Sequence, residues 1–367
     1  MKLPTAARPH LAGMTEAKVA AWARSRGATP GAAQTLARAL VAGFSGREPG
    51  PKSGTPQAAL VAAARETFDD ALPAAEAIED PDGTVRFAVR LEDGAIVETV
   101  LIHQAAAAGA EADDCAPGRP PRARERYTVC VSSQVGCARG CVFCETGRLG
   151  LVRNLRADEI VSQFAIAARH CAKAGRATPR NLVFMGMGEP LDNLEEVLAA
   201  IEVLRERAGF AVPDRRITVS TVGIVPKIDE LFARSSANLA LSLHALDPAA
   251  RLSLLPLLAR KFPVAELRAA IARAPRPVLL QWTLIAGEND RDLDADRLIE
   301  FCAGLDVRVN LIPLNPGPKP EQVAPGLARC REFQKRLLDA GVRAMLRMPH
   351  GQTVGGACGQ LAGARRR

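Results

Sequence analysis

The chain has 367 residues, nine of them cysteines, and a formal net charge of +8 at pH 7. This length can bury one core of barrel size plus a small accessory domain. The N-terminal sequence holds no apolar segment of signal-peptide length, and no stretch reaches the roughly 18 uncharged apolar residues of a membrane span. We therefore expect a cytoplasmic protein without membrane segments.

The cysteine count and the net charge further limit the kind of protein, its compartment and its partners. An odd number of clustered cysteines argues against a disulfide framework and for a reducing compartment in which thiols serve metals or catalysis. The positive charge favours a polyanionic partner, although an Arg-rich composition alone also makes a chain basic. Aromatic residues make up only 4% of the chain, which speaks against a broad stacking platform for bases.

The N-terminal part predicts a small helical unit. Apolar residues at helical spacing predict helices over residues 14–24, 32–44 and 58–67, and Thr15 is the expected N-cap of the first. Residues 46–56 are rich in Pro and Gly and predict a linker. We interpret residues 1–75 as a helical accessory domain.

A β-hairpin and a loop follow. Residues 84–91 and 95–102 alternate apolar and polar side chains around the turn sequence Glu92-Asp93-Gly94, and Glu98 lies on the second strand. A strand-borne carboxylate is more often solvated than functional. Residues 104–126 are Ala-, Pro- and Arg-rich and predict a flexible surface loop. We treat residues 76–126 as a hairpin extension with this loop.

From residue 127 to 363 the pattern is typical of an α/β barrel. Apolar runs predict strands over 128–131, 181–185, 216–220, 239–243, 278–284 and 307–314. Helical periodicity predicts helices over 157–174, 194–207, 226–232, 264–274, 292–302 and 326–341. Six βα units with right-handed crossovers curl into a partial or full barrel, and the loops after the strands then open on one face.

The cysteines Cys137, Cys141 and Cys144 stand at C-x3-C-x2-C spacing after an apolar run over 127–135 that predicts a strand. Three thiolates can hold three corners of a 4Fe–4S cluster and leave the fourth iron open to the amino and carboxylate groups of S-adenosylmethionine. A zinc knuckle or buried thiols are the alternatives. Zinc sites usually pair two spaced ligand clusters, and no second cluster follows here.

Polar residues follow four of the predicted strands, on the face where a barrel keeps its site. Each also has an ordinary explanation: Gly188 and Glu189 as a Gly-rich turn, Ser220 as a helix cap, His244 as a scaffold hydrogen bonder, and Asn315 as an Asx turn. All of these residues fall on the predicted site face together with the cysteines, which favours a role in ligand binding over the ordinary explanations.

Together these motifs resemble one family. The cysteine loop, GMGEP, STVG, SLHA, NLIPLNP and the terminal ACGQL are similar, in order, to the RlmN/Cfr family of radical-SAM RNA adenine methyltransferases, over roughly residues 98–363. The resemblance implies an α/β radical-SAM partial barrel. It also implies that the N-terminal helices resemble an accessory RNA-binding region.

The resemblance assigns roles to the outer cysteines. It implies that Cys358 accepts a methyl group from one S-adenosylmethionine, and that a second molecule of S-adenosylmethionine, bound to the cluster, yields a radical that takes hydrogen from that methyl group. Glu98 would be the proton acceptor. Cys130 would release the product through a transient disulfide with Cys358. From the residues alone, a cysteine in an apolar strand such as Cys130 is usually a small core residue, and the alternative for Cys358 near the C-terminus is an idle thiol.

The resemblance also implies ligands and partners. The expected S-adenosylmethionine ligands are Gly188, Glu189, Ser220, Ser242, Leu243, His244 and Asn315. The implied activity is methylation of adenine C2 in RNA, in 23S rRNA or tRNA, with an electron donor such as flavodoxin or ferredoxin. Alternatives are a Cfr-like C8 methyltransferase, a radical-SAM enzyme with a non-RNA substrate, and a non-catalytic RNA-binding relative.

The chain departs from the family pattern in two places, and these departures affect which residue roles can be transferred from the family. The chain between Glu98 and Cys130 is longer than usual, and MPHGQTVGG precedes ACGQL where the family has Arg-Gly and acidic residues. The second departure weakens the transfer of substrate contacts but leaves the cysteine chemistry intact. The basic tail, residues 364–367, is an expected phosphate contact or an inert end.

Overall fold

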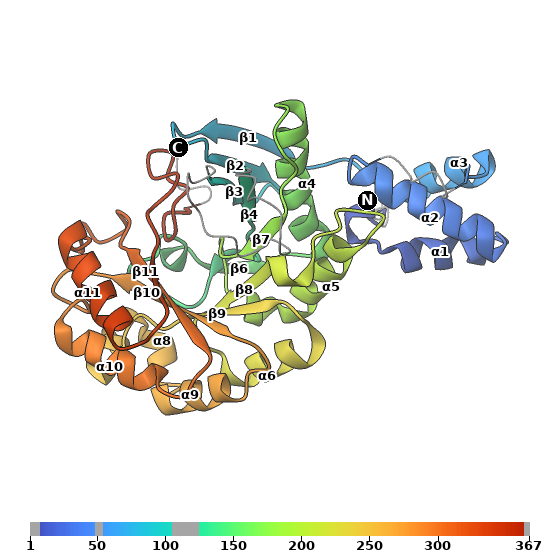
Figure 1. Ribbon diagram of the computed structural model, residues 1–367. Helices are drawn as coiled ribbons and strands as arrows, with labels where there is room; N and C mark the ends of the chain where they lie inside the picture. Colours follow the sequence, from blue (N-terminus) through green and yellow to red (C-terminus); the bar gives the residue numbers. More distant parts are fainter. Residues whose placement is uncertain (1–7, 48–53, 105–124, 363–367) are drawn as a thin grey trace, which may run out of the picture.

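The computed structural model describes residues 8–47, 54–104 and 125–362. Most of the predicted loop over 104–126 and the basic tail lie outside the described residues. The N-terminal helices are η1 (Leu11–Gly13), α1 (Glu16–Ser25), α2 (Pro30–Phe44) and α3 (Ala58–Thr67). Thr15 caps α1 as predicted, accepting a hydrogen bond from the Lys18 backbone N–H. Figure 1 shows these helices as a lobe beside α4 and α5.

One ten-stranded sheet carries the rest of the fold, in the order β1-β2-β3-β4-β7-β8-β9-β10-β11-β12. Its strands are β1 (Ala74–Glu79), β2 (Val85–Arg90), β3 (Ile96–Gln104), β4 (Arg126–Cys130), β7 (Asn181–Phe184), β8 (Ile217–Thr221), β9 (Asn238–Ser242), β10 (Val278–Leu284), β11 (Val307–Pro313) and β12 (Ala344–Leu346). Neighbours from β4 to β12 pair in parallel, and β1 to β4 pair antiparallel. Because β1 and β12 are both edges, the barrel is partial.

Helices alternate with the parallel strands. They are α4 (Ala157–Lys173), α5 (Leu194–Arg205), α6 (Val225–Arg234), α7 (Pro248–Leu254), α8 (Pro256–Ala259), α9 (Val264–Ala272), α10 (Asp292–Cys302) and α11 (Leu327–Asp339), with 3-10 turns η2 (Thr146–Arg148), η3 (Pro190–Asn193) and η4 (Asp214–Arg216). Figure 1 shows α6, α9, α10 and α11 on the outer face of the curved sheet. The predicted α/β fold with N-terminal helices is confirmed.

The apolar run over 127–135 is not one strand, which corrects the prediction. The chain leaves the large sheet after β4 and enters β5 (Gln134–Cys137), which pairs only with β6 (Gly150–Asn154) in a second sheet. The buried Gln163 side chain accepts from the Ser132 N–H and donates to the Ser132 carbonyl. These two bonds satisfy the backbone where the ladder breaks, so the break costs no hydrogen bonds.

The apolar core is continuous between the N-terminal helices and the barrel. Phe44 of α2 and Phe164 of α4 both pack edge-on against Phe210, at centroid distances of 6.1 and 5.1 Å. The boundaries at residues 75 and 126 stay predictions. Three further cysteines lie on helices and are buried in this core: Cys171, Cys302 and Cys330. None of the helices in the described ranges is long and apolar enough to cross a bilayer.

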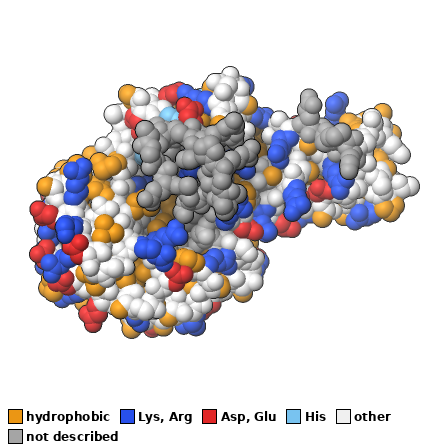
Figure 2. Space-filling view, viewed as in Figure 1, with side chains coloured by type: hydrophobic (Ala, Val, Ile, Leu, Met, Phe, Trp, Pro, Cys, Tyr) orange, Lys and Arg blue, Asp and Glu red, His pale blue; other side chains and the backbone are white. Residues whose placement is uncertain are grey.

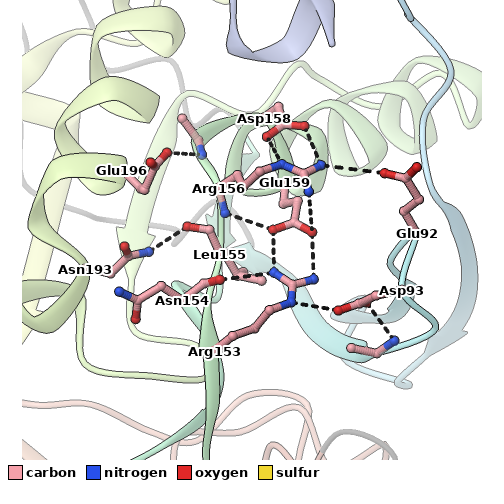
Figure 3. Close-up of polar contacts among 12 residues, drawn as sticks. Glu92, Asp93, Arg153, Asn154, Leu155, Arg156, Asp158, Glu159, Asn193 and Glu196 are labelled. Atoms are coloured by element: carbon pink, nitrogen blue, oxygen red, sulfur yellow. Dashed lines mark hydrogen bonds and ion pairs between the residues drawn. The ribbon is translucent and has the colours of Figure 1, made fainter. Parts of the chain in front are cut away.

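A charged network joins the β2–β3 turn to the β5–β6 hairpin and the start of α4 (Figure 3). Arg153 donates to both oxygens of Glu159, at 2.8 and 2.9 Å, and to Asp93 at 2.7 Å. Glu159 also accepts from the Arg156 backbone N–H. Because Glu159 is 4% exposed, its charge needs these partners. The network ties the hairpin that carries Cys137 to the barrel.

On the face seen in Figure 2, Lys and Arg side chains lie over both the N-terminal helices and the barrel, interspersed with Asp and Glu. Several of the surface cations are paired, for example Arg38 with Glu16 and Arg336 with Asp296. Among the described residues of this face, the cations are interspersed with acidic side chains.

Candidate active site

A large cavity lies at the carboxyl ends of the parallel strands. It holds about 960 Å³ of space between atoms, counting the part open to solvent. Its walls include the predicted residues Cys137, Cys141, Cys144, Gly188, Glu189, Ser220, Ser242, His244, Asn315 and Cys358. Only Leu243 of the predicted cofactor ligands is missing from the lining. Residues that are up to 221 positions apart in the sequence thus meet at the face formed by the loops after the strands.

The cysteine loop forms one wall of this cavity. Cys137 ends β5, and a turn with a 3.1 Å bond from the Cys144 N–H to the Cys141 carbonyl brings the later two thiols back toward it. Gly136 adopts φ +77°, and a Cβ there would meet the Gly150 carbonyl oxygen at 1.9 Å. Only glycine fits at this point, where the hairpin turns the loop toward the cavity.

The donor set of this loop fits an iron–sulfur cluster. Burial raises the pKa of Cys137 to about 12 and the pKa of Cys141 well above its usual value. Thiols in such surroundings stay neutral unless a cation lies among them, which iron supplies. No three His, Cys, Asp or Glu side chains in the described ranges converge on a single metal ion. A cluster places its ligands on separate irons, so its cysteines need not converge on one ion.

The glycines of GMGEP serve packing. A Cβ at Gly186 would lie 2.7 Å from the Val131 carbonyl group, and one at Gly188 would lie 2.7 Å from the Gln134 side chain. These glycines let the loop after β7 lie directly against the chain that leaves β4. Their side-chain-free edges also line the cavity.

Glu189 is a buried carboxylate at the cavity wall. Its two oxygens accept from the backbone N–H groups of Leu191 and Val222, at 3.0 and 2.9 Å. Burial raises the pKa of Glu189 to about 7, and these N–H groups oppose the rise. A cationic ligand group in the cavity would favour the ionised form. Glu189 therefore suits an ammonium group, as predicted from its position after β7.

Two serines share a partner that the sequence did not reveal. Ser220 and Ser242 both donate to the Gln281 amide oxygen, at 3.0 and 3.2 Å. Ser220 caps no helix: the N-cap of α6 is Ile224, without a side-chain bond. Gln281 lies in the middle of β10. Its polar side chain inside the apolar run over 278–284 was the one feature of the sequence that could have indicated a role in the site. Thr283, on the same strand, also lines the cavity.

His244 is held as a neutral ring. Its Nδ1 accepts from the Thr283 backbone N–H at 3.0 Å, which leaves the proton on Nε2. Burial lowers the pKa of His244 to about 3. His244 also has φ +56°, a conformation that is rare outside glycine. The imidazole is thus a fixed wall of the cavity whose Nε2–H is a donor.

Leu243 has a different place from the one predicted. Its side chain is fully buried, and its backbone N–H donates to the Gln281 carbonyl. Its own carbonyl accepts from the Arg251 guanidinium. With the side chain in the core and both backbone groups bonded, Leu243 contributes to the position of Ser242 and His244 and does not face the cavity.

Asn315 binds the C-terminal segment, defined here as residues 350–362. Its amide nitrogen donates to the Cys358 carbonyl at 3.0 Å, and its amide oxygen accepts from Gln352 at 2.8 Å. Both ends of the amide are therefore used, and the side chain makes no Asx turn. The sequence could not show this contact, because it joins residues that are 43 positions apart.

Cys358 lies between two cavities. It lines the large cavity and also a second one, whose walls include Cys130, Met185, Ile312, Arg347 and Leu361. Cys130 is buried at the end of β4, and burial together with the nearby Cys358 raises the pKa of Cys130 to about 12. Both thiols are free. Cys358 thus borders both the cavity lined by the cysteine loop and the cavity lined by Cys130.

Glu98 lines neither cavity. It is fully buried on β3, where its Oε1 pairs with Arg86 and its Oε2 accepts from the Ala362 backbone N–H at 2.6 Å. The alternative of a solvated strand carboxylate is wrong for this residue. Glu98 instead fastens the end of the C-terminal segment to the sheet.

Comparison with known proteins identifies the family. A sequence profile of the Radical SAM superfamily matches residues 131–299. A probable RNA methyltransferase of Sorangium cellulosum is 45% identical over 98% of this chain and 89% of its own length. The Dual-specificity RNA methyltransferase RlmN of Syntrophotalea carbinolica is 41% identical over 78% of this chain and 72% of its own.

The chain belongs to the RlmN family of radical SAM RNA methyltransferases. A crystal structure of a radical SAM methyltransferase from Sphaerobacter thermophilus supports this, with a TM-score of 0.81 and 35% identity over 96% of this chain and 99% of that one. Membership implies an iron–sulfur cluster and S-adenosylmethionine. The resemblance read from the motifs is confirmed at the level of family, fold and enzyme class.

Proposed function

We propose that this RlmN-family enzyme methylates the C2 carbon of an adenine in RNA, with 23S rRNA as the principal target and tRNA as a second substrate. It would work in the cytoplasm with a flavodoxin- or ferredoxin-like electron donor. Relatives named as dual-specificity RNA methyltransferases support an RNA substrate. The observation that carries the proposal is the position of Cys358 between the cysteine-loop cavity and the cavity that Cys130 lines.

Three cysteines would hold the cluster: Cys137, Cys141 and Cys144. When bound, the cluster and two molecules of S-adenosylmethionine per turnover supply one methyl group and one carbon-centred radical. Around the cofactor, Glu189 would face its ammonium group and the neutral His244 would donate from Nε2. Ser220, Ser242, Gly188 and Asn315 complete the wall against which it would lie.

Cys358 would carry the carbon. Its thiolate attacks the methyl carbon of a sulfonium: a sulfur–carbon bond forms at the cysteine, the sulfonium–methyl bond breaks, and the neutral thioether leaves with the electron pair. After the methyl carbon has joined the adenine ring, the ring proton must leave and the carbon–sulfur bond must break. Glu98 would take the proton and Cys130 would attack the Cys358 sulfur, which forms a disulfide. The disulfide must then be reduced before another turnover.

Glu98 can act in this way only after one contact has opened. Its Oε2 accepts from the Ala362 N–H, and its Oε1 is paired with Arg86. Movement of the end of the C-terminal segment would break the contact between Oε2 and Ala362 while the arginine still holds the carboxylate in place. The proposed proton transfer therefore depends on that segment being displaced.

The test is anaerobic reconstitution of the cluster followed by incubation with S-adenosylmethionine and in vitro transcribed 23S rRNA or tRNA. Mass spectrometry of the digested RNA should find 2-methyladenosine. An 8-methyladenosine product would overturn the assigned position, and unmodified adenine in both RNAs would overturn the function. Cys358→Ala should abolish methylation of the protein, and Cys130→Ala should accumulate a covalent protein–RNA adduct.

A further inference from the structure

A fully buried arginine beside the cysteine loop is not used by the proposed reaction. Arg251 belongs to α7 and is 1% exposed. Its Nη1 donates to the carbonyl oxygens of Leu243 and Ala245. Its Nε and Nη2 are buried and have no hydrogen-bond partner among the residues that the structure describes. An unsatisfied buried guanidinium is costly, so its survival in a core needs a reason.

The position of Arg251 points to the cysteine loop. The α7 backbone touches that loop, because the Val142 N–H donates to the Leu254 carbonyl at 3.2 Å. Cys141, Val142 and Phe143 pack on the small apolar cluster that includes Ala245 and Leu254. No carboxylate in the described ranges forms an ion pair with Arg251.

A neighbouring arginine shows the contrast. Arg139, two residues after Cys137, lines the large cavity that the cysteine loop also borders. Its guanidinium binds both oxygens of Asp192. The pair Arg139–Asp192 is therefore neutral as a unit, whereas Arg251 places a whole uncompensated charge next to the loop. The two arginines therefore differ in the net charge that they place beside the cysteine loop.

A cluster held by three thiolates is anionic, and its reduction adds one more negative charge. A nearby buried cation is attracted more strongly by the reduced form than by the oxidised form, and the low local dielectric strengthens the effect. Hydrogen bonds to cluster sulfurs also raise the reduction potential, and Arg251 has two N–H-bearing nitrogens, Nε and Nη2, without a partner in the part of the chain that the structure describes. We propose that Arg251 is the charge partner of the cluster and raises its reduction potential. It would be a positioning and tuning residue, without contact to RNA.

The experiment compares the reconstituted full-length enzyme with Arg251→Gln and Arg251→Lys. Both replacements can still donate to the Leu243 carbonyl, but only lysine keeps the charge. The midpoint potential of the cluster is measured by redox titration followed by electron paramagnetic resonance. We expect Arg251→Gln to make reduction at least tenfold less favourable, a fall of about 59 mV for a one-electron couple. Arg251→Lys should keep most of the potential.

The matched control is the double variant Arg139→Gln/Asp192→Asn. It removes a pair of charges beside the same cysteine loop while the net charge is unchanged, and we expect no shift of the potential. An unchanged potential in Arg251→Gln, or an equal fall in Arg251→Lys, would overturn the inference. If the glutamine variant takes up no cluster, the lysine variant decides alone: a potential near that of the parent enzyme supports the inference, and a tenfold loss contradicts it.

The inference is independent of the proposed RNA chemistry, since the potential is measured without RNA. An enzyme that methylates neither RNA would leave the Arg251 result unaffected. An enzyme that methylates RNA with an unchanged cluster potential in Arg251→Gln would contradict the Arg251 proposal alone.

Discussion

The turn between β1 and β2 holds the C-terminal segment, and Asp82 is the residue through which this contact can be tested. The Asp82 Oδ1 accepts from the Thr84 N–H at 2.8 Å, which closes the turn. Its Oδ2 accepts from the Gly351 N–H at 2.9 Å and lies 3.3 Å from the His350 ring. Figure 1 shows the segment in red beside β1 to β3. We predict that Asp82→Asn loosens the segment and leaves the turn intact.

The magnitude follows from what asparagine keeps and loses. The amide oxygen can still accept from Thr84, but the amide NH2 would face the Gly351 N–H, donor against donor. A hydrogen bond to a charged acceptor contributes about 1.5–3 kcal/mol. Because the Asp82 side chain is 33% exposed, water replaces part of the loss, and we expect a cost of about 1–2 kcal/mol. That corresponds to a rise of about 5–30-fold in the opening equilibrium.

The matched control is Asp93→Asn in the next hairpin. Asp93 closes the turn of β2 and β3 with the same kind of bond, from its Oδ1 to the Ala95 N–H. Its Oδ2 binds Arg153 and touches nothing in the C-terminal segment. Hydrogen exchange of the metal-free protein should therefore speed up at Gly351 and in residues 353–356 of Asp82→Asn only. Equal protection in both variants, or equal loss in both, would refute the reasoning.

The same contact predicts a pH dependence. Burial alone would raise the pKa of Asp82, but hydrogen bonds from the Thr84 and Gly351 N–H groups and the charge of His350 together lower it. A lowered carboxyl pKa means that the bond contributes fully above the unfolded pKa, near 3.9, and is lost as pH falls through the folded value. The contribution of Asp82 to protection of the segment, corrected for intrinsic exchange, should thus be complete above about pH 5 and decline below about pH 4.

Two further predictions concern stability. Gly186→Ala should lower the free energy of unfolding by about 1–3 kcal/mol, because its Cβ would lie 2.7 Å from facing backbone. Gly43→Ala, a helical glycine with open space, should be neutral or slightly stabilising in the same urea titration. Arg153→Ala should cost about 1–3 kcal/mol, because Glu159 stays buried with one partner fewer. Arg156→Ala, whose side chain is 55% exposed, should cost less than about 0.5 kcal/mol; equal melting temperatures for the two arginine variants would contradict this.

The barrel was predictable because its strands are buried on both faces. The run over 278–284 became β10 and the helical pattern over 292–302 became α10, with the same bounds. In contrast β1 was missed, because all its residues are exposed and its sequence AAEAIE favours a helix. Its backbone pairing with β2, together with the Glu79–Arg176 ion pair, holds it in place. The three-residue β12 is too short to produce a pattern.

The site was predictable where one strand-end motif places one side chain, and not where two distant side chains meet. The glycines, Glu189 and His244 follow strands and line the cavity as expected. Gln281 was missed because its partners Ser220 and Ser242 come from two other strands. The partners of an amide side chain on a strand can be predicted only once the order of β8, β9 and β10 is known.

The contacts of the C-terminal segment connect the proposed steps. Upstream of Cys358 the segment is held by Asp82, and downstream Ala362 is held by Glu98. Thr146, next to the cysteine loop, donates to the Leu361 carbonyl at 2.7 Å. Uncovering Glu98 therefore requires the chain on the far side of Cys358 to leave both β3 and the cysteine loop. Under the proposed function, the displacement that frees the proton acceptor is the same displacement that releases Cys358 from the cluster side toward Cys130, so proton loss and disulfide formation would be linked through one piece of backbone.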